Sequence, residues 1–339
     1  MGAPNRPTVA IDGPNLADDL RRHLDAHLPA FRSIPGVAGI TLNGGLSRGY
    51  ADELSEIDVT LYLDSATYAA WQAQRSPVAL GIVVIDGQLY DIKAADLARE
   101  REQEWESDAL WDASYAEILF DPHGDIQALL AEKLRRRPAP EDGAGFMMQC
   151  WWYYRLAGDI WICRGDAVQG HAMLNQAVVA LVKAIFCANA EFVPHEKWLL
   201  HMSRSLAWTP EAWPARLADA LDTGGMSPAS LVRRQAVVDA LWRETDANLV
   251  ARCFDDVPVH AMQASTYRML DFLARRDAVT LADWQAQGYG GVPNYEPFHS
   301  VIRIEGDTII LDRQKLLGLD PEAMYAWHYA VADAVRGER

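Results

Sequence analysis

The chain has 339 residues, which is more than one hydrophobic core usually holds, so we expect two domains with an appendage. Hydrophobic residues make up 50% of the sequence, which argues against global disorder. The net charge of -16 disfavours non-specific binding to nucleic-acid phosphates and favours cationic small molecules and metal ions as ligands. Solubility alone is the alternative explanation of this charge.

The cysteines and the apolar stretches argue against several further classes of protein. There are four cysteines: Cys150, Cys163, Cys187 and Cys253. None of them forms a C-x-x-C pair, which argues against a zinc ribbon or a redox dithiol. The start of the chain lacks the apolar run of a signal peptide. The most apolar stretch, 146–163, contains Arg155 and Asp159 and is too short and too charged for a membrane span. We therefore expect a cytoplasmic protein that is not bound to a membrane.

The first third of the chain alternates between helix and strand patterns. Leucines at positions 20, 24 and 28 predict an amphipathic helix over 16–31. Apolar and alternating runs predict strands, and further helical patterns lie between them. The predicted strands are 37–42, 57–63, 80–85, 88–93 and 116–120, and the further helices are 67–74 and 126–136. We therefore predict an α+β domain over residues 1–137, built on a mixed sheet.

The remainder of the chain is predicted to be mostly helical. A stretch rich in proline, glycine and charge at 135–145 indicates a domain boundary. Helices are predicted over 172–190, 198–206, 210–221 and 228–251. They form a helical-bundle domain over 144–256. A C-terminal extension over 257–339 contains a predicted hairpin (299–304 with 308–311) and a terminal helix (321–335).

One segment between the first two strands carries the chemistry. A turn at Gly44-Gly45 lets the backbone approach a ligand closely, and its N–H groups can cradle phosphate oxygens, with Ser47 and Arg48 beside them. Glu56 and Asp58 lie two residues apart at the next strand, so their side chains point to the same face. Two aligned carboxylates beside a phosphate cradle are the pattern that a divalent cation site requires. The alternative is an ordinary exposed strand after a glycine-rich loop.

This segment resembles the signature of the nucleotidyltransferase superfamily, which includes DNA polymerase β and the antibiotic nucleotidyltransferases. The matching residues are Leu42-Asn43-Gly44-Gly45, a spacer of ten residues, and Glu56-Ile57-Asp58-Val59. Gly45 stands where many members have serine, and Ser47 is a candidate substitute for that hydroxyl. Glu56 stands where aspartate is usual. The superfamily tolerates both departures.

The resemblance implies a role for each of these residues. Glu56 and Asp58 would bind one or two Mg²⁺ ions, and a third carboxylate is expected on a later strand of the same sheet. Asp91 fits that position as a metal ligand or general base; its alternative is an exposed acid paired with Lys93. The other turn residues, Gly44, Gly45, Ser47 and Arg48, would hold the phosphates of a nucleoside triphosphate.

In the antibiotic-modifying members a helical domain closes over the nucleotide and the acceptor, and two lysines here fit that picture. Lys183 lies on an otherwise apolar helix, and Lys197 lies at a helix start, where the helix dipole does not favour a cation. Both are candidates for binding the phosphates, although Lys183 can equally lie at the edge of a solvated face. The aromatic residues Trp151 to Tyr154 are interpreted as core rather than as a base-stacking surface.

The sequence therefore predicts an enzyme that transfers a nucleoside monophosphate from a triphosphate, with ATP expected, to a hydroxyl of a small cationic acceptor. An aminoglycoside-like antibiotic is the first acceptor considered. A toxin–antitoxin-type transferase that modifies RNA or protein is an alternative, with 135–137 as a local basic patch. A non-catalytic nucleotide-binding regulator is another. The protein would be a monomer or a homodimer.

Overall fold

The computed structural model describes residues 6–74, 76–276 and 278–319, and these form two compact units. The first comprises the residues up to Pro138 together with Ala190–Ala207, and the second comprises Ala139–Asn189 and the residues from Trp208 onward. The break after Pro138 lies in the stretch where the sequence indicates a boundary. The segment Ala190–Ala207 differs from the prediction, because it packs with the first unit and not with the helical one. The predicted extension after residue 257 belongs, as far as it is described, to the second unit.

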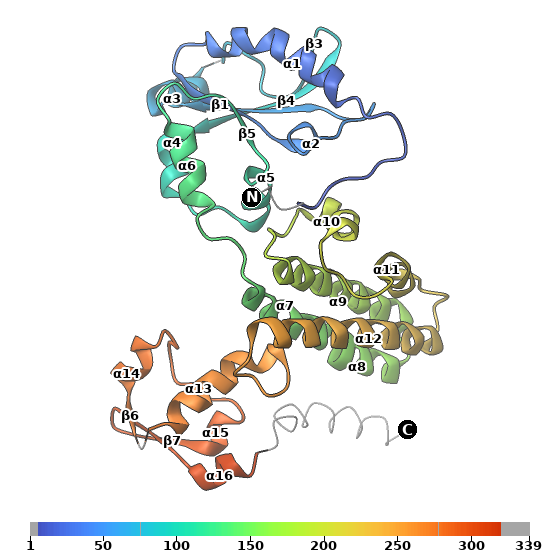
Figure 1. Cartoon of the computed structure of the whole chain (residues 1–339), viewed down its shortest axis with the longest axis vertical. Coiled ribbons are helices and arrows are strands. Elements are labelled where there is room, and N and C mark those ends of the chain that lie inside the picture. Colours follow the sequence, from blue (N-terminus) through green and yellow to red (C-terminus); the bar gives the residue numbers. More distant parts are fainter. Residues whose placement is uncertain (1–5, 75, 277, 320–339) are drawn as a thin grey trace. The chain divides into compact units, whose positions relative to one another are not determined.

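The first unit is an α+β domain built on a five-stranded mixed sheet (Figure 1). Its helices are α1 (Ala17–Arg32), α2 (Gly44–Ser47), α3 (Ser65–Ala73), α4 (Leu97–Glu102), α5 (Ser107–Ala113), α6 (Asp125–Lys133) and α10 (Glu196–Met202). Its strands are β1 (Val37–Leu42), β2 (Ile57–Leu63), β3 (Gly81–Ile85), β4 (Gln88–Asp96) and β5 (Glu117–Phe120). The strand order is β3-β4-β2-β1-β5; β2 runs parallel to β4, and the other pairs are antiparallel. All five predicted strands are confirmed, whereas the sequence patterns missed α4 and α5.

One face of the sheet is covered by α1. The leucines of this helix pack against the alternate residues of β2 that point the same way, Ile57 and Val59, and against Tyr90 of β4. The Tyr90 hydroxyl lies 2.8 Å from Nδ1 of His23 on α1, so the buried phenol is not left without a polar partner. Because strand residues alternate between faces, this packing turns Asp58 to the opposite face.

The opposite face is covered at one end only. There Tyr62 packs with Leu97 of α4 and with Ile126 of α6. Gly39 of β1 lies directly under α6, since a Cβ atom built on it would be 2.1 Å from Cγ1 of Ile126. Beyond Tyr62, toward the start of β2, α4 and α6 no longer cover the sheet, and the pocket described below lies there.

Ala190–Ala207 is attached to the first unit by contacts with the N-terminal segment. Arg6 forms an ion pair with Glu191 at 3.1 Å, and the backbone N–H of Thr8 donates to the Ser205 hydroxyl at 2.8 Å. Such pairings join residues almost two hundred positions apart. Local sequence patterns therefore give no sign of them.

The second unit is helical, with a small sheet near its C-terminal end. Its helices are α7 (Gly143–Trp151), a π-helical turn (Trp152–Ala157), α8 (Gly158–Arg164), α9 (Ala167–Ala188), α11 (Trp213–Leu221), α12 (Pro228–Cys253), α13 (Ala264–Ala274), α14 (Leu281–Ala286), α15 (Phe298–Val301) and α16 (Arg313–Leu317). Among the described residues, α9 is the one helix long and apolar enough to cross a membrane. Its most apolar window is 67% buried inside the protein, as expected of a core helix.

A three-stranded antiparallel sheet lies in the last described part of the chain. It contains β6 (Val279–Thr280), β7 (Ile302–Glu305) and β8 (Thr308–Leu311), in the order β6-β8-β7. The predicted hairpin is therefore confirmed, although its first strand begins later than expected because 298–301 is helical. The predicted terminal helix, 321–335, lies outside the described residues.

The close approach at Gly39 makes a test of this packing. Gly39→Ala is expected to lower the free energy of unfolding by about 1–3 kcal/mol, because Ile126 is fully buried and cannot move away freely. Gly145→Ala is the matched control. Nothing lies within 4 Å of its added Cβ, so the exchange in α7 should be neutral or stabilising. Urea titrations of both variants make the comparison, and equal stability for both would contradict the packing described.

Candidate active site

The glycine turn lies directly against the second carboxylate of the signature. Asn43 directly follows β1, and its N–H donates to the carbonyl of Asp58 at 2.9 Å. Gly44 follows with φ +68°, a conformation that favours glycine, and a Cβ there would be 1.7 Å from Oδ2 of Asp58. The turn therefore needs glycine for two reasons: the backbone angle and the space taken by the carboxylate.

Ser47 and Arg48 follow on and after α2, and both are engaged within the protein. The Ser47 hydroxyl donates to the Gly44 carbonyl at 3.0 Å and so closes the turn. Nη1 of Arg48 donates to Oδ1 of Asp112 at 2.7 Å, and the guanidinium carbon lies 4.5 Å from the centre of the Trp111 ring. The Arg48 side chain is only 5% exposed. Its guanidinium is thus held in one place by α5.

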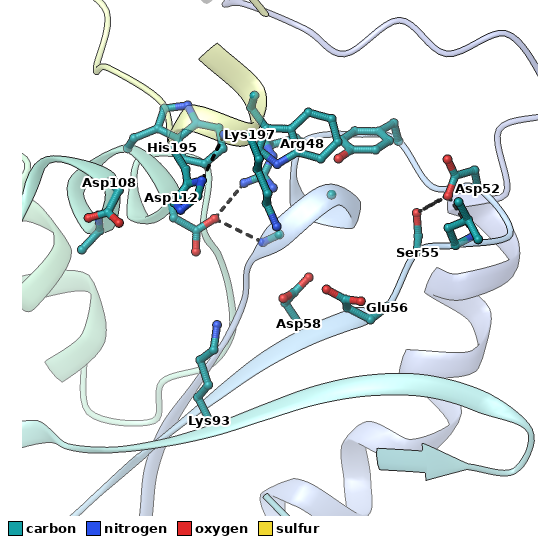
Figure 2. A pocket seen from close by; sticks show the side chains of 17 residues that line it. Arg48, Asp52, Ser55, Glu56, Asp58, Lys93, Asp108, Asp112, His195 and Lys197 are labelled. Carbon is teal, nitrogen blue, oxygen red and sulfur yellow. Dashed lines mark hydrogen bonds and ion pairs between the residues drawn. The ribbon is translucent and has the colours of Figure 1, made fainter. Parts of the chain in front are cut away.

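The two carboxylates of the signature lie side by side and point into the pocket (Figure 2). A tight turn precedes them in the chain. In this turn Oδ1 of Asp52 accepts hydrogen bonds from the Leu54 N–H and the Ser55 hydroxyl. Burial, and next the charge of Glu56, raise the pKa of Asp58 to about 6. An acid that resists ionisation in this way, beside a second acid, is stabilised by a bound cation.

Asp91 is the direct neighbour of Asp58 in the parallel register of β4 with β2, so the two side chains share a face. Oδ2 of Asp91 lies 3.2 Å from Nζ of Lys93, which is the pairing that the alternative interpretation expects. Burial by itself lowers the pKa of Lys93. The hydrogen bond to Asp91 and the negative charges of Asp91, Asp58 and Asp112 together outweigh this effect, so the pKa of Lys93 is raised. Lys93 lines the pocket and Asp91 does not. The role of Asp91 as ligand or base stays a prediction.

These groups surround a pocket of about 680 Å³ that lies wholly in the first unit. Its lining consists of Gly44, Gly45, Arg48, Tyr50, Asp52, Leu54, Ser55, Glu56, Asp58, Lys93, Asp108, Ala109, Trp111, Asp112, His195, Lys197 and Trp198. Helix α10 contributes Lys197, which reaches into the pocket in Figure 2. Trp198 holds α10 against the turn, because its ring meets Tyr50 edge-on at 5.4 Å.

The structure brings most, but not all, of the sequence-predicted site residues together. Gly44, Gly45, Arg48, Glu56, Asp58 and Lys197 all line the pocket. Ser47 is adjacent but turns its hydroxyl inward, and Lys183 lies on α9 of the second unit. The phosphate-binding roles of these lysines and of Ser47 are not tested by their positions and stay predictions.

Sequence reasoning missed the wall of the pocket that α5 provides. Asp108 and Asp112 lie four residues apart on this helix, so both face one side, and Trp111 lies between them. The spacing of these two acids was the only available signal. It carried little information, because the helix is short and nothing local indicates that it packs against Arg48.

The pocket residues fit a divalent cation that is shared with a nucleotide. Among residues 6–74, 76–276 and 278–319, no three His, Cys, Asp or Glu side chains form a metal cage on their own. Mg²⁺ commonly binds one or two carboxylates and completes its shell with water and substrate phosphates. Glu56 and Asp58 supply such a pair, and Asp58 resists ionisation, so the donor set suits a cation that arrives with its nucleotide.

The pKa of Asp58 predicts the effect of its removal on stability. The folded chain keeps the Asp58 proton up to about pH 6, whereas the ordinary value is 3.8, so stability falls as the pH rises through that window. Without metal, Asp58→Asn should therefore raise the free energy of unfolding at pH 7.5 by about 2 kcal/mol. The gain should be smaller at pH 5.

Urea titrations in a chelating buffer at both pH values measure this gain. Asp108→Asn, the same substitution on α5, is the control for loss of one pocket charge. A wild-type protein more stable than Asp58→Asn at pH 7.5 would contradict the raised pKa.

Comparisons with known proteins give little further information. No protein-family model and no curated protein matches the chain. Among solved structures, it is similar to one described as a nucleotidyltransferase-like protein from Exiguobacterium sibiricum, with 11% identity and a TM-score of 0.39, over 86% of this chain and 98% of that one. A similarity of this size establishes neither fold nor function. The functional conclusion therefore depends on the signature and on the pocket.

Proposed function

We propose that this protein is a nucleotidyltransferase that moves a nucleoside monophosphate from a triphosphate to an acceptor hydroxyl. The observation that carries the proposal is the turn at Gly44, which lies against Asp58 with Glu56 alongside, in one pocket with Arg48 and Lys197. In support, Gly44 and Glu56 are twelve residues apart in sequence and line one cavity.

The donor nucleotide would be bound by its phosphates. Gly44 and Gly45 line the pocket, and the ammonium of Lys197 and the guanidinium of Arg48 supply positive charge there. When bound, Mg²⁺ would supply positive charge that offsets the charge on the phosphates. Glu56 and Asp58 would hold it, and catalysis would depend mainly on positioning and electrostatics.

The reaction is an in-line displacement at the α-phosphorus. The acceptor oxygen forms a new bond to phosphorus, the bond to the bridging oxygen breaks, and pyrophosphate leaves. The acceptor's proton would pass to a carboxylate oxygen of Asp91 and then to solvent. Asp91 is the candidate for this role because it adjoins Asp58 on the same sheet face, and to act it must exchange its contact with Lys93 for one with the acceptor.

The acceptor is proposed to be a small cationic molecule, with an aminoglycoside-like antibiotic as the first class to test. The net charge of -16 supports this choice, and so does the pocket, which presents five carboxylates against three side-chain cations. A polyanionic acceptor such as RNA would be repelled by this charge.

The proposal is tested by incubating the whole chain with Mg²⁺ and each nucleoside triphosphate. Aminoglycosides, lincosamides and tRNA serve as acceptors, and pyrophosphate release and a labelled product are measured. Asp58→Asn should lower turnover by about 10³-fold, equivalent to about 4 kcal/mol of transition-state stabilisation. Asp108→Asn should retain activity, because it lines the pocket but is assigned no part in binding or chemistry. Tight binding of a triphosphate without turnover on any acceptor would support a regulatory protein instead, and full activity of Asp58→Asn would refute the assignment.

A further inference from the structure

A carboxylate of the protein itself occupies the donors that the proposed phosphate site would use. Oδ1 of Asp112 accepts a hydrogen bond from Nη1 of Arg48 at 2.7 Å and a longer one from the Gly44 N–H at 3.4 Å. Figure 2 shows both contacts as dashed lines converging on one oxygen. Two donors from the signature turn thus converge on an anion supplied by α5.

Arg48 has little freedom to bind a second anion elsewhere. Its side chain is 5% exposed and lies over the ring of Trp111, and its Nε is buried without a hydrogen-bond partner among the described residues. A desolvated guanidinium of this kind is strongly stabilised by a single well-placed anion. An incoming phosphate and Asp112 therefore compete for the same group.

The Asp112 carboxylate, in contrast, can move away from Arg48. Its side chain is 32% exposed, so a displaced carboxylate can be hydrated by solvent at the mouth of the pocket. Asp108, one helical turn earlier on α5, lines the same pocket but makes no contact with Arg48 or Gly44; its Oδ1 accepts from the N–H of Ala109. The two acids share a helix and a cavity, but of the two only Asp112 contacts Arg48 and Gly44.

We propose that Asp112 is an internal competitor of the nucleotide: its carboxylate fills the phosphate position on Arg48 in the free protein, and a phosphate group must displace it to bind. The inference depends on the proposed function, since it concerns regulation of the same site. Asp112 keeps the buried guanidinium paired when no nucleotide is present. It also lowers the affinity of the empty pocket for anions that lack an accompanying cation.

The test is calorimetric binding of pyrophosphate, in the presence of Mg²⁺, to the whole chain. Asp112→Asn preserves the shape of the side chain and removes its charge, so it should bind pyrophosphate about tenfold more tightly than wild type. Asp108→Asn should change the affinity by less than about twofold. Tighter binding cannot result from loss of structure, so the readout separates competition from a merely structural role.

A second pair of variants ties the gain to Arg48. In an Arg48→Gln background, Asp112→Asn should no longer tighten binding, because the shared donor is gone. A gain that persists there, or one that Asp108→Asn matches, would overturn the inference and indicate general charge repulsion. If wild type binds pyrophosphate and Asp112→Asn binds it no more tightly, this inference is overturned but the proposed function is not. Absence of pyrophosphate binding in every variant would overturn the proposed function as well.

Discussion

The architecture of the site depends on one close approach, that of the Gly44 backbone to the Asp58 carboxylate. Gly44 begins the turn after β1, Asp58 lies on the antiparallel neighbour β2, and the Asn43 N–H that donates to the Asp58 carbonyl fixes their positions relative to each other. Any side chain at position 44 would occupy the position of the Asp58 carboxyl group. The same contact therefore starts the turn directly after β1 and places the N–H groups of the turn next to the carboxylates of Glu56 and Asp58. Neither half of the site can move without the other.

The two faces of the sheet differ in their packing, and this difference determines which side chains lie near the pocket. Because α1 buries Ile57 and Val59 on one face, Asp58 must lie on the other, together with its neighbour Asp91 on β4. At the far end of this second face, α6 packs on Gly39 and α4 on Tyr62. The hydrophobic core thus covers the sheet completely on one side and partly on the other. Asp58 lies in the part that α4 and α6 do not cover, and burial in the pocket together with the charge of Glu56 raises its pKa.

The parts of the site that the sequence predicts are those that local patterns specify. An apolar run identifies β1 and alternation identifies β2, both with their observed bounds, and Gly44 and Asp58 meet because these two strands pair. The wall formed by α5 and α10 was not predictable in this way, because Asp112 reaches Arg48 across 64 residues and Trp198 reaches Tyr50 across a still longer separation. A seven-residue helix has too few turns to show a reliable period. Lys197 was selected for its charge at a helix start, and the assignment of its segment to the helical domain was wrong.

The charges of the pocket explain why its strongest cation is buried. An exposed arginine among five carboxylates would be neutralised by whichever acid came nearest, including Glu56 or Asp58. Stacking on Trp111 and pairing with Asp112 hold Arg48 on the opposite wall instead, so the signature carboxylates remain available to a cation. Asp112 therefore has two effects in the proposed site, since it keeps the guanidinium away from Glu56 and Asp58 and occupies the donors that we assign to a phosphate. In the proposed site, a polyanion that arrives with its own cations pairs with Arg48 through the anion and with Glu56 and Asp58 through the cations. A cation alone or an anion alone would pair with only one of these two sets.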